Sequence, residues 1–332
     1  MDRSAQHAQK IVETALETSV EHCERAQGGA VSETFVVTLD TESRRGDSER
    51  LDGEPQRVVC KLGGANIWTG DVVEPHVVEL VRRKTDLPVP TVLASGSLRR
   101  TEFERYRGDS PTDRWALYEF LDGTSPRETA IENRRTFVTT AGELLGRLHS
   151  AFRFDRIGGF VRATDGLRVS EPTSRNLLAS PLGRLPSLVT DERGVSTGDG
   201  HFADSVDHRP VLDHGDYHPG NLLVEGSEIT AVLDWGNAHV TDPEYALARA
   251  EIRLVDFADV THSERRQLRQ AFRDGYARHA SLAPSYRDRA PVYRGLWLAQ
   301  SGLNLGAIAT TSRGRGQLWR QLKNWFSRRE LF

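Results

Sequence analysis

The sequence predicts a two-lobe α+β fold, with an antiparallel β-sheet in the first lobe and mainly helices in the second. Short apolar runs rich in β-branched residues fill the first part of the chain, and longer segments with helical spacing follow residue 123. A β-rich half before an α-rich half indicates segregated layers and not an alternating parallel sheet. The length of 332 residues also suits two lobes.

The first lobe is predicted to be a sheet with one inserted helix. Its strands are apolar runs bounded by polar or turn-forming residues, at 27–40, 57–62, 88–94, 101–106 and 115–121. A helix precedes them over residues 4–25, where apolar side chains from Ile11 to Val20 recur at helical spacing. The inserted helix lies at 74–84, with Pro75 suited to its first turn and Asp71 a possible cap upstream.

The second lobe is predicted to be built from long helices, at 127–152, 243–259, 263–279 and 291–305. Gly123 follows the last strand of the first lobe and indicates a hinge near residues 119–123. We therefore divide the chain into lobes at 1–122 and 123–332. Residues 155–208 are predicted to be mainly irregular, and the sequence does not decide between a lid and a static insertion.

Composition narrows the class of protein. No run of 18 apolar residues occurs, and the N-terminus lacks the apolar core of a signal peptide, so we expect a cytoplasmic protein with no membrane partner. The two cysteines, Cys23 and Cys60, lack the spacing of a zinc site and are interpreted as reduced core residues. A net charge of −3 argues against a nucleic-acid partner. A monomer and a homodimer remain equally open.

The densest group of chemically active residues is the segment from His214 to Asn221, followed by Asp234. Phosphoryl transfer needs a carboxylate beside the acceptor hydroxyl and hard oxygen ligands for a metal ion on the phosphates. In protein kinases an asparagine follows the catalytic aspartate by five residues, as Asn221 follows Asp216 here. The intervening residues 222–233 form two apolar runs around Gly226, which predicts a hairpin that returns Asp234 to the same side.

These motifs resemble those of a known family. The sequence HGDYHPGN followed by LDWGNAHVTDP is similar to the signature of the aminoglycoside phosphotransferase-like kinases, a family with a protein-kinase-like fold that includes relatives acting on choline, fructosamine and homoserine. The resemblance extends along most of the chain, because GGAVSETFVV, RVVCKL, TDLPVPTVLA, YEFLDG and ELLGRLHS follow in the family's order.

The resemblance implies a direct, in-line transfer of the nucleotide γ-phosphate to a small-molecule hydroxyl, with Asp216 as catalytic base. Asn221 and Asp234 are implied as Mg²⁺ ligands. The residues implied in binding ATP or GTP are Lys61, Glu74, Gly28, Gly29, Ser32, Glu119 and Leu121. Glu74 is the expected partner of Lys61, with Glu79 as second choice. Trp235 is interpreted as a packing residue.

Two other functions compete with a kinase. A metallohydrolase or phosphoesterase would use His214, Asp216 and His218, together with His239, as metal ligands. A nucleotide-binding module without catalysis would not need Asp216, Asn221 and Asp234 together. The intact set of these three residues favours the kinase.

The acceptor is predicted to be a small polar molecule, such as a sugar, an amino-alcohol or an aminoglycoside-like compound. Residues 251–332 contain 15 Lys and Arg against 7 Asp and Glu. This local excess of positive charge disfavours a polycationic acceptor, because such a ligand prefers an acidic pocket.

Overall fold

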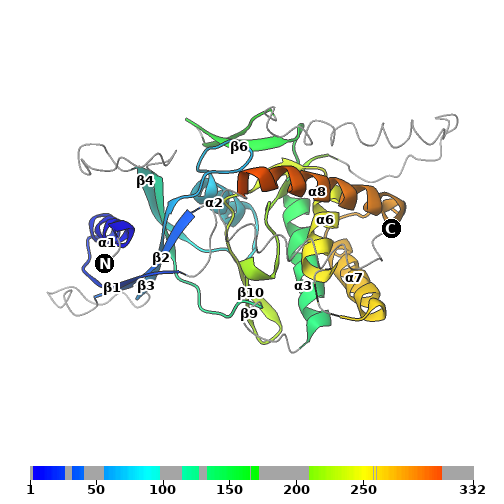
Figure 1. Ribbon diagram of the computed structural model, residues 1–332, viewed down its shortest axis with the longest axis horizontal. Coiled ribbons are helices and arrows are strands. Elements are labelled where there is room, and N and C mark those ends of the chain that lie inside the picture. The colour runs from blue at the N-terminus through cyan, green and yellow to red at the C-terminus, as the bar shows by residue number, and fades with distance from the viewer. Residues whose placement is uncertain are drawn as a thin grey trace.

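The computed structural model describes residues 3–26, 32–40, 56–97, 114–126, 133–164, 166–171, 209–256, 258 and 260–308. The predicted strand at 101–106 and the residues Gly28 and Gly29 lie outside this part. The chain forms a two-lobe α+β structure, with an antiparallel sheet in the N-terminal lobe and helices in most of the C-terminal lobe (Figure 1). The predicted fold class is confirmed.

Within the described residues, the N-terminal sheet holds five antiparallel strands in the order β1-β2-β3-β5-β4. Their bounds are Val20–Arg25 (β1), Ser32–Leu39 (β2), Arg57–Gly63 (β3), Val92–Ser97 (β4) and Arg114–Glu119 (β5). In β3 the side chains alternate between faces, as expected for a strand. Val58, Cys60 and Leu62 are buried on one face, which places Lys61 on the other.

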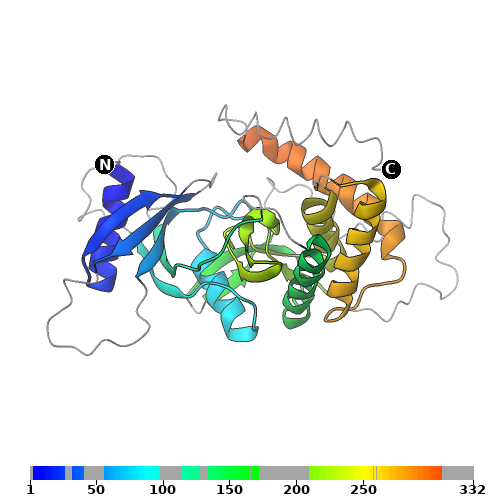
Figure 2. The ribbon, with the colours of Figure 1, turned by 90° about the horizontal axis from the view of Figure 1, so that it is seen from below.

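Each face of this sheet is covered by a helix (Figures 1 and 2). Helix α1 (Arg3–Leu16) packs Ala8, Ile11 and Val12 against the face that carries Cys60 and Leu117. Helix α2 (Glu74–Lys84) lies on the opposite face, and its Val77, Val78 and Val81 share a core with Ala116 and Tyr118. Burying an aliphatic side chain contributes about 1.5–3 kcal/mol, so both helices are held mainly by packing.

The first helix is shorter than predicted. It ends at Leu16, Glu17 adopts a left-handed φ of 50°, and Val20 begins strand β1. The helical spacing that extended the prediction to residue 25 was wrong beyond this point, because β1 pairs with β2 from Val20 to Arg25. A β-branched residue such as Val20 suits a strand better than a helix.

Helix α2 begins and ends where the sequence predicts, but Asp71 does not cap it. Val73 occupies the N-cap position without a side-chain hydrogen bond. Asp71 instead accepts from the N–H of Val72 (2.9 Å) and from the backbone N–H and Nε of Arg162 (2.9 and 2.8 Å). The side chain of Asp71 therefore ties the loop before α2 to strand β6 (Gly158–Ala163) of the other lobe.

The helices of the C-terminal lobe are α3 (Arg134–Ala151), α6 (Pro243–Glu251), α7 (His262–Ala277) and α8 (Tyr286–Ile308). Helix α3 begins later than predicted because Asn133 caps it, accepting from the N–H of Thr136 at 3.0 Å. Helix α6 gives way to a π-helical turn, Ile252–Asp256. Helix α8 begins before the predicted Pro291, which stands inside the helix near its N-terminal end.

Helices α3 and α7 approach closely along a glycine seam formed by Gly142, Gly146 and Gly275. A Cβ atom at Gly142 would lie 2.1 Å from the carbonyl oxygen of Phe272, and one at Gly275 would lie 2.1 Å from that of Thr139. Contacts this short do not occur for real Cβ atoms, so the two backbones can meet only because the side chains are absent.

Short strands lie between the N-terminal sheet and the helices of the C-terminal lobe (Figure 1). Strands β6 (Gly158–Ala163), β7 (Gly166–Val169), β8 (Val211–Asp213) and β11 (His239–Thr241) form one sheet, and β9 (Leu222–Glu225) pairs with β10 (Glu228–Val232). The β6-β7 hairpin lies within residues 155–208, which the sequence predicts to be mainly irregular, so main-chain pairing forms there despite a weak apolar pattern. Residues 172–208 lie outside the described part, so the choice between lid and insertion stays open.

Two further sequence expectations concern cysteines and membranes. Both cysteines are free thiols, with Cys60 buried and Cys23 only half-buried. Among the described helices, none is both long and apolar enough to cross a lipid bilayer.

Candidate active site

The segment from His214 to Asn221 forms a tight loop between β8 and β9. Gly215 adopts a left-handed φ of 83°, and a Cβ atom there would lie 1.9 Å from the carbonyl oxygen of Asn237. Glycine is therefore required by both conformation and space. The loop closes with a 3₁₀ turn, Pro219–Asn221, in which His218 Nδ1 accepts from the N–H of Gly220 at 2.8 Å.

His214 fixes the shape of this loop. Its Nε2 lies 2.9 Å from the carbonyl oxygen of Leu233 and carries the hydrogen, so that Nδ1 accepts from the N–H of Asp216 at 3.1 Å. Burial lowers the pKa of His214 to about 4, which keeps the ring neutral in this tautomer at neutral pH. Both ring nitrogens are committed to the backbone, so the role of His214 is structural.

The carboxylate of Asp216 is held at both oxygens. Oδ2 accepts from Asn221 Nδ2 at 3.1 Å and lies 3.3 Å from His218 Nε2, whereas Oδ1 forms an ion pair with Arg253. Burial alone raises the pKa of Asp216, but Arg253 and His218 outweigh burial and hold the pKa well below its usual range. Asp216 is therefore an oriented carboxylate that is ionised at neutral pH.

The β9-β10 hairpin places Asp234 beside this loop. The turn contains Gly226 at a left-handed φ of 61°, and the N–H of Leu233 donates to the carbonyl oxygen of Asn221 at 2.8 Å. The predicted hairpin is confirmed. Asp234 itself has a φ of 64°, an uncommon conformation for a residue that carries a side chain.

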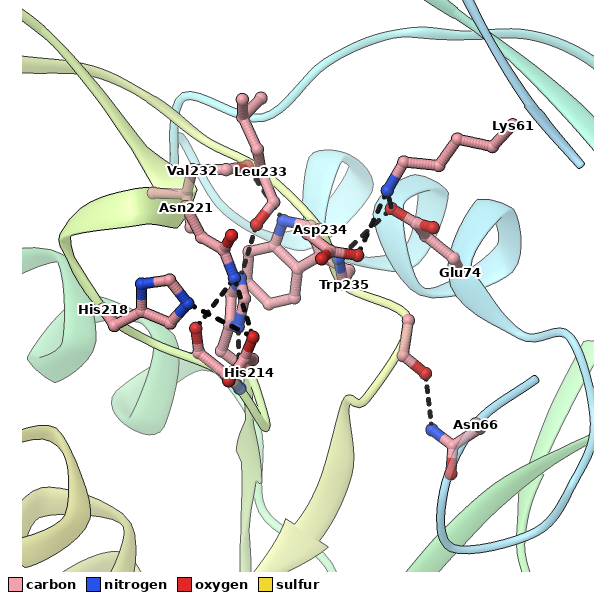
Figure 3. A network of polar contacts seen from close by, with 12 residues as sticks. Lys61, Asn66, Glu74, His214, His218, Asn221, Val232, Leu233, Asp234 and Trp235 are labelled. Carbon is pink, nitrogen blue, oxygen red and sulfur yellow. Dashed lines mark hydrogen bonds and ion pairs between the residues drawn. The ribbon is translucent and has the colours of Figure 1, made fainter. Parts of the chain in front are cut away.

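Lys61 joins the two lobes at this point. Its Nζ lies 2.7 Å from Glu74 Oε1 and 3.1 Å from Asp234 Oδ1. Burial alone lowers the pKa of Lys61, but these two carboxylates outweigh burial and hold the pKa above its ordinary value. The predicted pairing of Lys61 with Glu74, in preference to Glu79, is confirmed. Figure 3 shows Asn221, Asp234, Glu74 and Lys61 following one another across the site.

Three further hydrogen bonds hold the turn after Asp234 against the N-terminal lobe. Glu74 Oε1 accepts from the N–H of Trp235 at 3.2 Å, and Asn66 Nδ2 donates to the carbonyl oxygens of Gly236 (2.8 Å) and Ala238 (2.9 Å). The indole of Trp235 is fully buried, as expected for a packing residue, and Nε1 donates to the carbonyl oxygen of Val232 at 3.0 Å. The turn is thereby fixed relative to helix α2.

The donor set of Asn221 and Asp234 fits Mg²⁺. Asn221 Nδ2 donates to the backbone oxygen of Asp216 at 2.9 Å and to Oδ2 at 3.1 Å, which orients the amide so that its nitrogen faces Asp216. The amide oxygen then lies on the side away from these two acceptors. One amide oxygen and the Asp234 carboxylate are hard ligands of the kind that Mg²⁺ prefers, with phosphate oxygens and water completing its shell.

The other residues that the sequence predicts to bind the nucleotide differ in their positions and contacts. Ser32 begins β2 opposite Gly63, at the end of the sheet that also carries Lys61. The N–H of Glu119 donates to the carbonyl oxygen of Thr91 at 3.0 Å, so a backbone contact of this residue with a base would have to come from its carbonyl oxygen. Leu121 lies two residues further along the chain and is half-buried.

Sequence reasoning missed Arg253 and Asn66. Arg253 lies 37 positions after Asp216 in the basic region 251–332, and no motif contains it. Asn66 stands in a loop after β3, between residues that carry no family motif. A polar residue in the apolar loop after the strand that carries Lys61 is only a weak indication of a functional role. Its hydrogen-bond partners lie far away in the sequence and become clear only from the fold.

The metallohydrolase alternative does not fit the histidines. His214 and His218 each use both ring nitrogens in contacts with other groups of the protein, and His239 Nδ1 lies 3.0 Å from the carbonyl oxygen of Asn237. Burial lowers the pKa of His239 to about 4, and its ring stacks on Trp68. In the part of the chain that the structure describes, no cluster of three His, Cys, Asp or Glu residues is arranged to hold a metal ion.

Comparison with known proteins agrees with this geometry. Residues 74–292 match the model of the family described as "Phosphotransferase enzyme family". Comparison with curated protein sequences found no match.

Solved structures of similar fold span nearly the whole chain. A thermostable mutant of aminoglycoside phosphotransferase APH(4)-Ia, solved with AMP-PNP and hygromycin B, is 19% identical with a TM-score of 0.54, over 94% of this chain and 96% of that one. Macrolide 2′-phosphotransferase MphH from Brachybacterium faecium is 18% identical with a TM-score of 0.50, over 92% and 94%. The GDP complex of an aminoglycoside 2′-phosphotransferase-IIIa mutant is 15% identical with a TM-score of 0.53, over 97% and 98%.

The TM-scores of these structures support a shared fold, and the family match covers more than half of the chain. The chain therefore belongs to the phosphotransferase enzyme family of aminoglycoside phosphotransferase-like small-molecule kinases.

Proposed function

We propose that this protein transfers the γ-phosphate of ATP or GTP to a hydroxyl of a small polar molecule, with Asp216 as catalytic base. The observation that carries the proposal is the joint placement of Asp216, Asn221, Asp234 and Lys61, which come from two lobes and meet at one site. The similar structures hold an ATP analogue in one case and GDP in another, so both nucleotides remain candidates for this chain.

In the proposed mechanism, Lys61 binds the α- and β-phosphates, and Glu74 keeps the ammonium group in place. Asn221 and Asp234 would hold Mg²⁺, which would neutralise charge on the phosphates. The carboxylate of Asp216 orients the acceptor hydroxyl for in-line attack and takes its proton as the new O–P bond forms, while the bond from the γ-phosphorus to the bridging oxygen breaks and the nucleoside diphosphate leaves. An oriented carboxylate suits this role, because most of the catalysis of phosphoryl transfer comes from positioning and charge stabilisation.

The nucleotide is proposed to bind between the lobes, with the boundary near residue 122. On this assignment residues 1–122 hold the base and phosphates, with Ser32 and the Gly28-Gly29 segment on the phosphate side. Residues 123–332 then carry Asp216 and the acceptor site.

The test is Asp216→Asn, a substitution that preserves size and hydrogen-bonding capacity but removes the base. We expect acceptor phosphorylation to fall by about 10²–10⁴-fold, with the KM for nucleotide nearly unchanged. Asp86→Asn is the matched control, because Asp86 is an exposed carboxylate in an ion pair with Arg147 at 3.3 Å. Equal turnover in the two variants would contradict the proposal.

A further inference from the structure

Arg253 occupies an unusual backbone position beside the proposed base. It stands in the π-helical turn Ile252–Asp256 that follows α6. The other four residues of this turn are buried, whereas the Arg253 side chain is 20% exposed. π-Helical turns are rare and occur frequently at functional sites. The turn thus directs one cation toward the site while its neighbours pack into the core.

The guanidinium of Arg253 contacts one particular oxygen of Asp216. Oδ2 is held from the other side by Asn221 and His218, whereas Oδ1 faces Arg253. An acceptor hydroxyl that approaches Oδ1 must therefore arrive next to a guanidinium group. Any substituent a few bonds from that hydroxyl experiences the positive charge of Arg253 at short range.

The carboxylates around this position are already paired within the chain. Asp213 lies 3.0 Å from Arg249, Glu251 lies 2.5 Å from Arg273 and 2.7 Å from Arg294, and Glu244 and Asp256 are paired with Arg289 and Arg269. These carboxylates are almost completely buried. An amine-bearing acceptor would have to compete with arginines for them, and removing one partner of a buried ion pair is unfavourable.

We infer that the acceptor carries an anionic group, a carboxylate or a phosphate, close to its reactive hydroxyl, and that Arg253 binds this group. The inference rests on the proposed kinase function and names the substrate class of the same site. The planar guanidinium forms paired hydrogen bonds with either anion. By turning from Asp216 to the acceptor, Arg253 releases Oδ1 for the hydroxyl and offsets repulsion between the acceptor's anion and the nucleotide phosphates.

The test compares acceptors that share a hydroxyl and differ in charge. Glycerol is the neutral compound, glycerate and glycerol 3-phosphate are its anionic counterparts, and hygromycin B serves as an amine-bearing polyol. Each is assayed with Mg²⁺ and ATP or GTP, both as acceptor and as competitive inhibitor of basal nucleotide hydrolysis. Nucleotide binding is measured separately by thermal shift. The proteins are the wild type, Arg253→Gln, Arg253→Lys and the matched control Arg278→Gln.

Arg278 is an exposed arginine at the far end of α7 that pairs with Glu143, so its loss should leave acceptor kinetics unchanged. We expect the anionic compounds to be the better acceptors or inhibitors. Arg253→Gln should raise their KM or inhibition constant by about 10- to 100-fold, as loss of a charge-assisted hydrogen bond predicts, and should change the constant for glycerol much less. The constants of Arg253→Lys should lie between those of the wild type and Arg253→Gln, because lysine keeps the positive charge but cannot form the paired hydrogen bonds of the guanidinium group.

The possible results separate this inference from the kinase proposal. Preferential use of hygromycin B, or equal constants for anionic compounds in the wild type and Arg253→Gln, would overturn the inference and leave a kinase with another acceptor. Intact nucleotide binding without any effect of an anionic compound would overturn it as well. Failure to bind ATP or GTP would instead overturn the proposed function, and this inference with it.

Discussion

The side chain of Asn66 is predicted to be a main stabilising link between the two lobes at the active site. It is almost completely buried, donates to the carbonyl oxygens of Gly236 and Ala238, and accepts from the N–H of Trp68 at 2.9 Å. Asn66→Ala removes three hydrogen bonds, each with a net contribution of about 1 kcal/mol. We therefore expect the free energy of unfolding to fall by about 3 kcal/mol, a large share of the about 5–15 kcal/mol of a typical domain.

The same substitution should lower kcat/KM. The Gly236 and Ala238 carbonyls belong to the turn that follows Asp234, so its loosening displaces a proposed Mg²⁺ ligand. Unfolding is followed by circular dichroism in urea, and activity by coupled nucleotide consumption. Asn66→Asp should be at least as damaging, because it keeps the acceptor for Trp68 but places a carboxylate against two carbonyl oxygens.

Asn237→Ala is the control for this experiment. Asn237 lies at the same junction but is half-buried, and its Oδ1 makes only a long contact of 3.5 Å with the N–H of Ile67. We expect it to change the unfolding free energy by less than about 1 kcal/mol. If Asn66→Ala were no more destabilised than Asn237→Ala and equally active, the assignment of Asn66 as an interlobe link would be refuted.

Two further predictions concern stability. Gly142→Ala should lower the melting temperature by several degrees, although alanine has the better helix propensity, because the new Cβ atom would clash with the carbonyl oxygen of Phe272. Gly295→Ala is the control: a Cβ atom there would have no other atom within 4 Å, so this variant should be neutral or stabilised by up to about 1 kcal/mol. Equal melting temperatures would argue against the glycine seam. Burial lowers the pKa of His149 to about 4, whereas its pKa in the unfolded chain is about 6.5. The neutral, buried ring therefore contributes its full stability above pH 6.5. That contribution, up to about 3 kcal/mol, is lost as the pH falls through 4. Melting curves from pH 7 to 4 should show this loss, and a His149→Gln variant with the same pH dependence would contradict it.

The sequence predicts the fold and the order of the site residues because these depend on local patterns. The segment from His214 to Asn221 has a fixed spacing, and the hairpin after it is marked by apolar runs around Gly226. The Lys61 to Glu74 pair follows from a strand and a helix whose bounds are themselves clear in the sequence.

Other features depend on contacts between distant segments and leave no local pattern. Val20 fits a helical spacing equally well, and only pairing with β2 makes it a strand residue. Asp71 has the composition of a helix cap, but Arg162 lies near enough to compete for its carboxylate. Arg253 reaches Asp216 from a turn whose π-helical form does not follow from residue propensity.

The backbone of Asp234 sets stability and chemistry against each other. At a φ of 64°, an aspartate is less stable than glycine by about 1–2 kcal/mol, since only glycine adopts this conformation without a steric penalty. Replacement by glycine would relieve the strain and at the same time remove the carboxylate that contacts Lys61. A laboratory selection for heat resistance alone would therefore favour variants at this position that have lost catalytic power, so thermostable versions should be selected with activity as a second criterion.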